Sequence, residues 1–207
     1  MRTDSAVVPA TSKTTPRERL RVTVRPLTAD LWPAFEDLFG PNGACGGCWC
    51  MYWRIGSRYQ RRPKAENRND FLSIVRRGPP PGLLAFDGDR AVGWCQVTPR
   101  GDLAFLERAP RLQPLPAGPV WSVSCFYIRR GYRRRGVSEA LLAAAIEHAR
   151  SAGAPGLEAY PSDVQLAETP QPVYTGVASI FARAGFRRVA GENPVRPIMR
   201  RTFRRPY

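Results

Sequence analysis

The fold is decided by residues 125–142, whose sequence is CFYIRRGYRRRGVSEALL. The stretch begins inside a run of apolar residues of high β-propensity, 120–128, which has apolar residues on both faces and therefore predicts a central strand. An arginine-rich turn follows. A helix is predicted directly after it, over 136–152, because Leu141, Leu142 and Ile146 fall at helical spacing.

The turn between this strand and this helix has the features of a phosphate-binding site. Free backbone N–H groups and the dipole of a helix N-terminus attract anions. Gly136 allows a ligand to approach the backbone closely, and the arginines can donate charge-assisted hydrogen bonds. No Gly-Lys-Ser/Thr follows, so the spacing excludes a P-loop, and it also departs from the dinucleotide-binding fingerprint.

The flanking sequence predicts a mixed α/β chain. A hairpin with the turn Asp87-Gly88 argues for antiparallel strands, and the strand–helix–strand unit of 120–160 argues for local parallel pairing. Residues 1–20 are expected to be a disordered leader and 21–207 a single domain. The other expected strands are 21–25, 83–86, 91–97, 157–160, 186–189 and 197–203, and the other helices are 28–38, 63–77 and 174–184.

The arginine-rich turn resembles motif A of the GNAT superfamily of N-acetyltransferases, whose signature is Arg/Gln-x-x-Gly-x-Gly/Ala. Arg133, Gly136 and Ser138 occupy its three positions, and Ser138 departs from the usual Gly or Ala while remaining small. The resemblance implies an α/β (α+β) GNAT fold: a twisted, mostly antiparallel mixed sheet of about six to seven strands with about four helices.

The same resemblance implies acetyl-coenzyme A as cosubstrate, with its pyrophosphate over the turn and its pantetheine arm in a gap between strands 120–128 and 157–160. An amine would attack the thioester directly, and a backbone N–H near Phe126 would stabilise the oxyanion. No metal is expected. The implied cofactor-binding residues are Phe126, Tyr127, Ile128, Arg133, Arg134, Arg135, Gly136, Val137 and Ser138.

The acid and the base are not fixed by the resemblance. Many relatives carry a tyrosine before a late Gly-Phe pair as the acid for the thiolate, but here Phe181 stands at that position and cannot donate a proton. Tyr174 and Tyr160 are the alternatives. Glu158 is the preferred base, and its competing interpretation is an exposed strand carboxylate or a partner of an arginine.

A loop rich in cysteine and aromatic residues, GACGGCWCMYWR at 43–54, lies between the first two expected helices. This loop followed by the later core resembles a bacterial GNAT subgroup, and the family resemblance implies that the segment between the first two helices borders the acceptor site. The substrate-binding candidates are Trp49, Tyr52, Trp53 and Cys125, with core packing as the alternative for the aromatic residues. A zinc knuckle at Cys45, Cys48 and Cys50 would lack a matching second pair of ligands.

The net charge of +15 favours a partner rich in phosphate or carboxylate. Nearly all the basic residues are arginine and they are scattered, which indicates a GC-rich bacterial genome better than a nucleic-acid-binding surface. The number of cysteines is odd, and the sequence shows neither a secretory signal nor an apolar run of about 20 residues. We therefore expect a cytoplasmic protein that does not contact membranes.

We therefore expect an N-acetyltransferase acting on a small-molecule amine. A peptide acetyltransferase and a non-catalytic module that binds coenzyme A or nucleic acid are the alternatives. A homodimer stays open, because dimers are common in the family.

Overall fold

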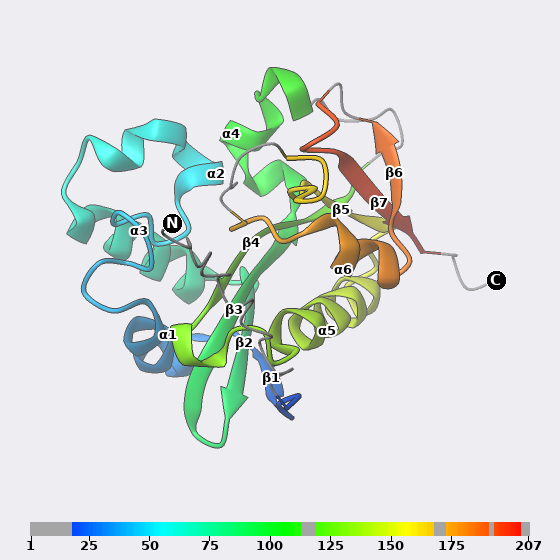
Figure 1. Cartoon of the computed structure of the whole chain (residues 1–207). Coiled ribbons are helices and arrows are strands. Elements are labelled where there is room, and N and C mark those ends of the chain that lie inside the picture. Colours follow the sequence, from blue (N-terminus) through cyan, green and yellow to red (C-terminus); the bar gives the residue numbers. More distant parts are fainter. Residues whose placement is uncertain (1–17, 113–118, 168–172, 191–192, 204–207) are drawn as a thin grey trace, which may run out of the picture.

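A single seven-stranded sheet organises the computed structural model, which describes residues 18–112, 119–167, 173–190 and 193–203 (Figure 1). The strand order is β1-β2-β3-β4-β5-β7-β6, and only β4 and β5 run parallel. The predicted mixed, mostly antiparallel sheet is confirmed. The strands are β1 Thr23–Pro26, β2 Gly82–Asp87, β3 Arg90–Pro99, β4 Trp121–Ile128, β5 Gly156–Ala159, β6 Arg187–Ala190 and β7 Ile198–Thr202.

Helices cover both faces of the sheet, with α5 on one face and α1 on the other. The helices are α1 Trp32–Phe39, α2 Tyr52–Ile55, α3 Lys64–Arg77, α4 Ala104–Glu107, α5 Val137–Ser151 and α6 Ala178–Arg183. The short 3₁₀ helices are η1 Ala29–Leu31, η2 Gly56–Gln60, η3 Arg100–Asp102, η4 Pro110–Leu112 and η5 Arg130–Tyr132. In the described residues, no helix combines the length and the apolar character that a membrane crossing requires.

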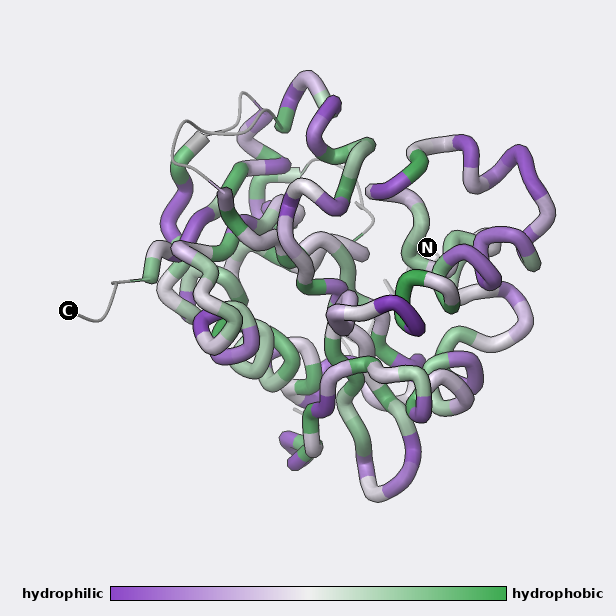
Figure 2. The backbone as a smooth tube through the Cα atoms, turned by 180° about the vertical axis from the view of Figure 1, so that it is seen from behind, coloured by the Kyte–Doolittle hydropathy of each residue, from purple (hydrophilic) through white to green (hydrophobic). Residues whose placement is uncertain are grey.

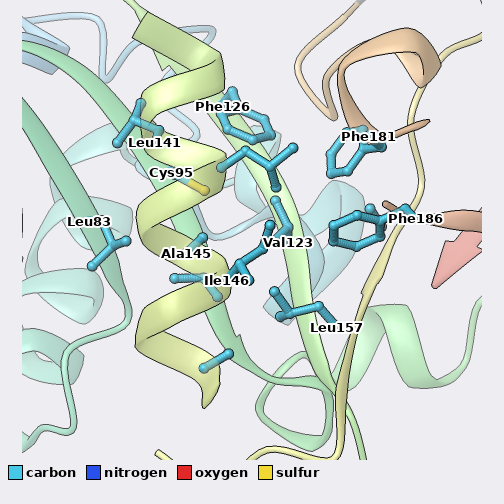
Figure 3. Close-up of a cluster of buried hydrophobic side chains, with 14 of the residues drawn as sticks. Leu83, Cys95, Val123, Phe126, Leu141, Ala145, Ile146, Leu157, Phe181 and Phe186 are labelled. Carbon is cyan, nitrogen blue, oxygen red and sulfur yellow. The ribbon is translucent and has the colours of Figure 1, made fainter. Parts of the chain in front are cut away.

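Alternate residues of the central strands supply two separate cores. On β2, Leu83 and Ala85 face α5, whereas Leu84 and Phe86 face α1 and α3, as the two-residue period of a strand requires. Figure 3 shows the core on the α5 side, where Leu141, Ala145 and Ile146 of the helix meet the sheet. Two-sided burial explains why the central strands are mostly apolar. The largely hydrophilic segment from η2 into α3 lies at the periphery (Figure 2).

The N-terminal boundary lies close to the arginine-rich turn. Residues 1–17 of the expected leader are outside the described residues. Leu20, also assigned to that leader, packs against the core below α5, and its backbone N–H donates to the carbonyl of Arg135. The chain therefore contacts the turn before the first strand begins.

Two predicted helix starts are wrong. The first helix, expected from Thr28, is the 3₁₀ turn η1 followed by α1, because Pro33 at the second position of α1 favours a helix start there. The late helix, expected from Tyr174, begins only at Ala178. Tyr174 and Thr175 form a turn instead, closed by the Gly176 N–H on the Val173 carbonyl at 2.9 Å, and Gly176 has a φ of 83°. The Tyr174 carbonyl accepts from Phe126 N–H at 2.6 Å.

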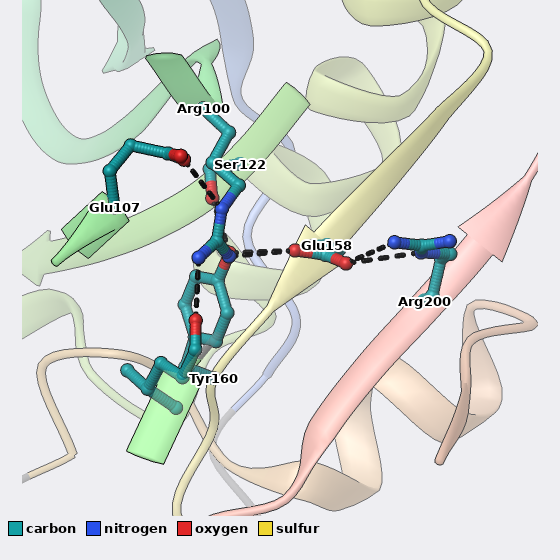
Figure 4. Close-up of polar contacts among 7 residues, drawn as sticks. Arg100, Glu107, Ser122, Glu158, Tyr160 and Arg200 are labelled. Carbon is teal, nitrogen blue, oxygen red and sulfur yellow. Dashed lines mark hydrogen bonds and ion pairs between the residues drawn. The ribbon is translucent and has the colours of Figure 1, made fainter. Parts of the chain in front are cut away.

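Arg100 of η3 binds side chains or backbone of α4, η4 and β5 (Figure 4). It is only 4% exposed, and its Nη1 donates to Glu158 Oε2 at 2.9 Å and to Tyr160 Oη at 2.6 Å. Its Nε also pairs with Glu107 at 2.7 Å. Arg200 on β7 binds the second oxygen of Glu158 at 2.5 Å. A buried carboxylate is therefore neutralised from two sides, and this fixes β5 between η3 and β7.

Replacing Arg100 with Met should destabilise the fold by about 3–5 kcal/mol, because the buried carboxylate of Glu158 loses one of its two cations. Urea unfolding followed by circular dichroism measures the loss. Arg150→Met is the control: its ion pair with Glu147 is exposed, so a loss of at most about 1 kcal/mol is expected. Equal losses in the two variants would contradict the structural role of Arg100.

Candidate functional site

The turn after β4 presents the N-terminus of the longest helix. Gly136 is the N-cap of α5 in the left-handed conformation, and no side chain caps the first N–H groups. Arg134 also has a positive φ, of 60°. For a residue with a side chain this conformation costs on the order of 1–3 kcal/mol, and such outliers cluster at ligand clamps. These features are typical of a helix N-terminus that binds an anion.

A cavity of about 630 Å³ lies against this turn, and we call it the turn cavity. All of the predicted cofactor residues line it except Arg135, whose Nε donates to the Glu18 carbonyl and whose guanidinium lies over the Tyr132 ring. Glu139 also borders the cavity, but its carboxylate pairs with Arg19 and Arg183. The lining residues are Phe126, Tyr127, Ile128, Tyr132, Arg133, Arg134, Gly136, Val137, Ser138, Glu139, Val173, Tyr174, Gly176, Val177 and Ile180.

Strands β4 and β5 separate halfway along β4. They pair only from Trp121–Leu157 to Val123–Ala159, so Phe126 has no β5 partner. The segment 173–177 lies in the opening: Tyr174 O accepts from Phe126 N–H, and Val177 forms a parallel bridge with Ser162. The gap is present as expected, and Phe126 N–H, near which the oxyanion donor is expected, donates to the Tyr174 carbonyl in this structure.

Gly176 makes this arrangement possible. A Cβ at Gly176 would lie 2.8 Å from the Phe181 ring and 3.3 Å from the Phe126 ring. Phe181 itself is fully buried, and its ring stands edge-on to Phe126 and Phe186 (Figure 3). Phe181 is therefore a core residue that fixes the segment 173–177.

A second cavity, of about 330 Å³, lies across β4 from the first, and we call it the aromatic cavity. The two cavities share Phe126, Tyr127 and Tyr174. The lining of the aromatic cavity is Phe39, Gly43, Ala44, Cys45, Cys48, Cys50, Tyr52, Trp53, Tyr59, Gln96, Ser124, Cys125, Phe126, Tyr127, Tyr174, Thr175 and Arg196.

Three of the four predicted substrate residues, Tyr52, Trp53 and Cys125, line the aromatic cavity. Trp53 is fixed there by a hydrogen bond from its Nε1 to the Ser124 carbonyl at 2.9 Å. Trp49 is outside the cavity. It is 3% exposed and its ring packs against Phe39, with centroids 5.7 Å apart, so its place is in the core beside α1.

Four cysteines line the aromatic cavity as thiols: Cys45, Cys48, Cys50 and Cys125. Burial raises the pKa of Cys48 to about 11, and burial together with the Cys125 thiol raises the pKa of Cys50 well above its ordinary value. Trp94 Nε1 also donates to Cys50 Sγ at 2.9 Å. Among the described residues, no three His, Cys, Asp or Glu side chains are grouped so that they could hold a metal ion.

The three catalytic candidates fall in two places. Tyr174 lies where the cavities meet, and its hydroxyl donates to Cys45 Sγ at 3.2 Å. That hydrogen bond is the main reason why the pKa of Tyr174 is raised. Glu158 and Tyr160 line neither cavity and belong to the buried Arg100 cluster, where burial raises the pKa of Tyr160 (Figure 4).

Several polar residues at the aromatic cavity escaped sequence reasoning. Gln96 on β3 is buried and accepts from Ser124 Oγ at 2.8 Å, while Thr175 and Arg196 come from segments after β5. Gln96 could have been suspected, because it interrupts an apolar strand. Thr175 and Arg196 carry no local signal, since only the tertiary arrangement brings them to β4.

The comparisons with known proteins agree on a family. The model of the acetyltransferase (GNAT) family matches residues 47–169. No curated protein matches the chain. Similar solved structures include a PaiA N-acetyltransferase of Thermoplasma acidophilum in complex with coenzyme A, with 12% identity and a TM-score of 0.52 over 89% of this chain and 100% of that one.

Two further structures have the same fold. A histone acetyltransferase HPA2-related protein of Corynebacterium glutamicum is 20% identical, with a TM-score of 0.54 over 90% of this chain and 99% of that one. A mosquito arylalkylamine N-acetyltransferase-like protein, 5b, is 12% identical, with a TM-score of 0.57 over 88% and 100%.

Maleimide should modify Cys45 well before Cys48 at pH 7.5. Cys45 is exposed, whereas a thiol with a pKa of about 11 has almost no reactive thiolate at that pH. Because the folded pKa is raised, labelling of Cys48 should rise about tenfold per pH unit between pH 8 and 10. Peptide mass spectrometry measures both rates, and a rate for Cys48 that levels off below pH 9 would contradict the assignment.

Proposed function

Because the chain belongs to the GNAT family of acetyltransferases, we propose that it transfers an acetyl group from acetyl-coenzyme A to the primary amine of a small molecule. One observation carries the proposal: the turn cavity and the aromatic cavity lie on either side of β4 and share Phe126, Tyr127 and Tyr174. A cosubstrate in the first and an acceptor in the second would meet at these residues.

The turn cavity fits acetyl-coenzyme A by its donors. The uncapped N-terminus of α5 suits the pyrophosphate, and the guanidinium of Arg133 adds a cation beside it. Arg133 Nε is anchored on the Ile128 carbonyl at 3.1 Å, which leaves its terminal nitrogens for a ligand. The cosubstrate supplies an acetyl thioester, and the chain supplies the orientation that brings the thioester toward Tyr174.

The aromatic cavity favours a small acceptor. Its volume of about 330 Å³ is near the lower end of the range of roughly 300–1,000 Å³ for small-molecule sites. Structural neighbours do not decide this point, because their names include an arylalkylamine N-acetyltransferase-like protein and a NatC complex bound to a Gag peptide. The support comes from the cavity itself, which is bounded by the rings of Phe39, Tyr52 and Trp53.

Tyr174 is the proposed general acid. Its raised pKa keeps the hydroxyl protonated at neutral pH, and the hydroxyl already donates to a sulfur atom, Cys45 Sγ, the same kind of acceptor as a leaving thiolate. For the base, the described residues of the aromatic cavity offer no carboxylate. The amine is therefore proposed to lose its proton to water, and Glu158 is reassigned to the buried Arg100 cluster.

Two measurements test the proposal in sequence. Calorimetry with acetyl-coenzyme A should give saturable binding with one site per chain, and no binding even at low salt would refute the enzyme. Thiol release over a panel of amines and short peptides then tests the acceptor. Faster release with peptides than with every small amine would refute the small-molecule acceptor while retaining acetyl transfer.

Arg133→Gln should weaken coenzyme A binding about tenfold or more, because it removes a charge-assisted donor from the turn cavity. Arg135→Gln is the matched control, since Arg135 is turned toward Glu18 and Tyr132 and should change the affinity little. Calorimetry measures both dissociation constants. Equal losses would mean that only the summed charge of the turn attracts the ligand.

Tyr174→Phe should lower kcat about 10²-fold while coenzyme A still binds, because the proton donor is lost and the ring is kept. An acid must be protonated to act, and its pKa is raised above the ordinary 10, so the wild-type kcat should not fall between pH 7 and 9 through this group. Tyr160→Phe should instead reduce stability with little change in kcat. A loss of kcat in Tyr160→Phe together with an unchanged kcat in Tyr174→Phe would instead make Tyr160 the general acid.

A further inference from the structure

The chemistry of the aromatic cavity is unusual for a site that receives an amine. Among its described lining residues Arg196 carries the single formal charge, and it is positive. The amide at the cavity floor is satisfied internally: Gln96 Oε1 accepts from Ser124, and Gln96 Nε2 donates to the Cys50 carbonyl at 3.3 Å. The cavity therefore offers an ammonium group no charge partner and leaves one guanidinium facing it.

Arg196 has no partner of its own among the described residues. It is half-buried and lines the cavity, yet its guanidinium makes no hydrogen bond or ion pair with them. The nearby carboxylate of Asp163 is taken by Arg188 at 2.9 Å. By contrast, the buried Arg100 and the nearly buried Arg200 both have carboxylate partners. A half-buried cation that the described residues leave without a partner, beside a largely apolar cavity, can bind an anion from outside the chain.

Thr175 provides a second, independent sign of a missing polar partner. Its side chain is 6% exposed and borders the aromatic cavity, and its Oγ1 is buried without a hydrogen bond in the described structure. Buried hydroxyls are nearly always hydrogen-bonded in folded proteins. A ligand oxygen in the cavity would satisfy this donor.

Backbone hydrogen bonds bring these two residues to the same end of the cavity. Ser162 N–H donates to the Gly176 carbonyl at 2.9 Å, and the next residue, Asp163, donates to the Val195 carbonyl at 2.8 Å. The segment 162–163 thus lies between Gly176, which follows Thr175, and Val195, which precedes Arg196. One hydroxyl donor and one cation consequently flank one region of the aromatic cavity.

We propose that the acceptor carries a carboxylate on an apolar or aromatic body, and that Arg196 and Thr175 bind this carboxylate while the amine faces Tyr174. The planar guanidinium matches a carboxylate in two-point geometry, and the hydroxyl adds a third hydrogen bond. A single cation suits a singly charged group. The rings of Phe39, Tyr52 and Trp53 enclose the body. This assignment rests on the proposed function and narrows its acceptor class.

Direct binding tests the anion site without any turnover. In the presence of coenzyme A, 3-phenylpropanoate should bind at least tenfold more tightly than its neutral isostere 3-phenylpropanamide, as measured by calorimetry. Arg196→Gln should make the two affinities equal. Equal affinities in the wild type, or an unchanged preference in Arg196→Gln, would overturn the proposal.

Matched variants exclude a general effect of charge. Arg187 on β6 is exposed and outside the aromatic cavity, so Arg187→Gln removes the same charge and should retain the preference for the anion. Loss of the preference in Arg187→Gln would attribute it to the net charge of +15 and overturn the site. Thr175→Val should reduce the preference at least threefold, and an unchanged preference would overturn the assignment of Thr175.

Amine pairs separate this inference from the proposed function. Thiol release is compared between 4-(aminomethyl)benzoate and 4-(aminomethyl)benzamide, and between phenylalanine and phenylalaninamide. The proposal expects at least a tenfold higher kcat/KM for the acid of one or both pairs. Turnover in which the neutral member equals or exceeds the acid in both pairs would overturn the carboxylate site and leave acetyl transfer standing. Failure of acetyl-coenzyme A to bind would instead refute the proposed function.

Discussion

The candidate site depends on the limited pairing between β4 and β5. Strand β4 is bonded to β3 along most of its length but to β5 only as far as Val123, because the two parallel strands diverge there. Past that point the segment 173–177 lies in the opening beside β4, with a cavity toward α5 and another toward the cysteine loop. A fully paired β4 would leave the two cavities without a common boundary.

The sequence was most informative where structure is local. The strand ending at Ile128, the turn at Gly136 and the helix α5 follow from β-propensity, glycine and helical spacing within one short stretch. The Asp87-Gly88 hairpin is equally local. For the same reason, the residues predicted to bind the cofactor line one cavity, with Arg135 as the exception, since the direction of one arginine in an arginine-rich turn depends on its surroundings.

The acceptor side was only partly predictable. An aromatic loop indicates apolar surface but not which rings face outward, so Tyr52 and Trp53 at the cavity could not be distinguished from Trp49 in the core. The Tyr174 carbonyl, in a turn, accepts a hydrogen bond from Phe126 N–H, and a pattern of helical spacing cannot reveal such a bond. The strand carboxylate Glu158 could be assigned only after its two arginine partners were seen.

The hydrogen bond between Phe126 N–H and the Tyr174 carbonyl sets the energetics of anything that docks on this part of β4. A ligand carbonyl that takes this amide must displace a bond of 2.6 Å that the chain already makes. The free energy that the ligand gains is then the difference between the new hydrogen bond and the one it displaces, plus the free energy of any new hydrogen bond to the released Tyr174 carbonyl. This amide therefore contributes to selectivity among ligands more than to affinity: it favours those that offer a better-aligned acceptor and also satisfy the carbonyl they set free.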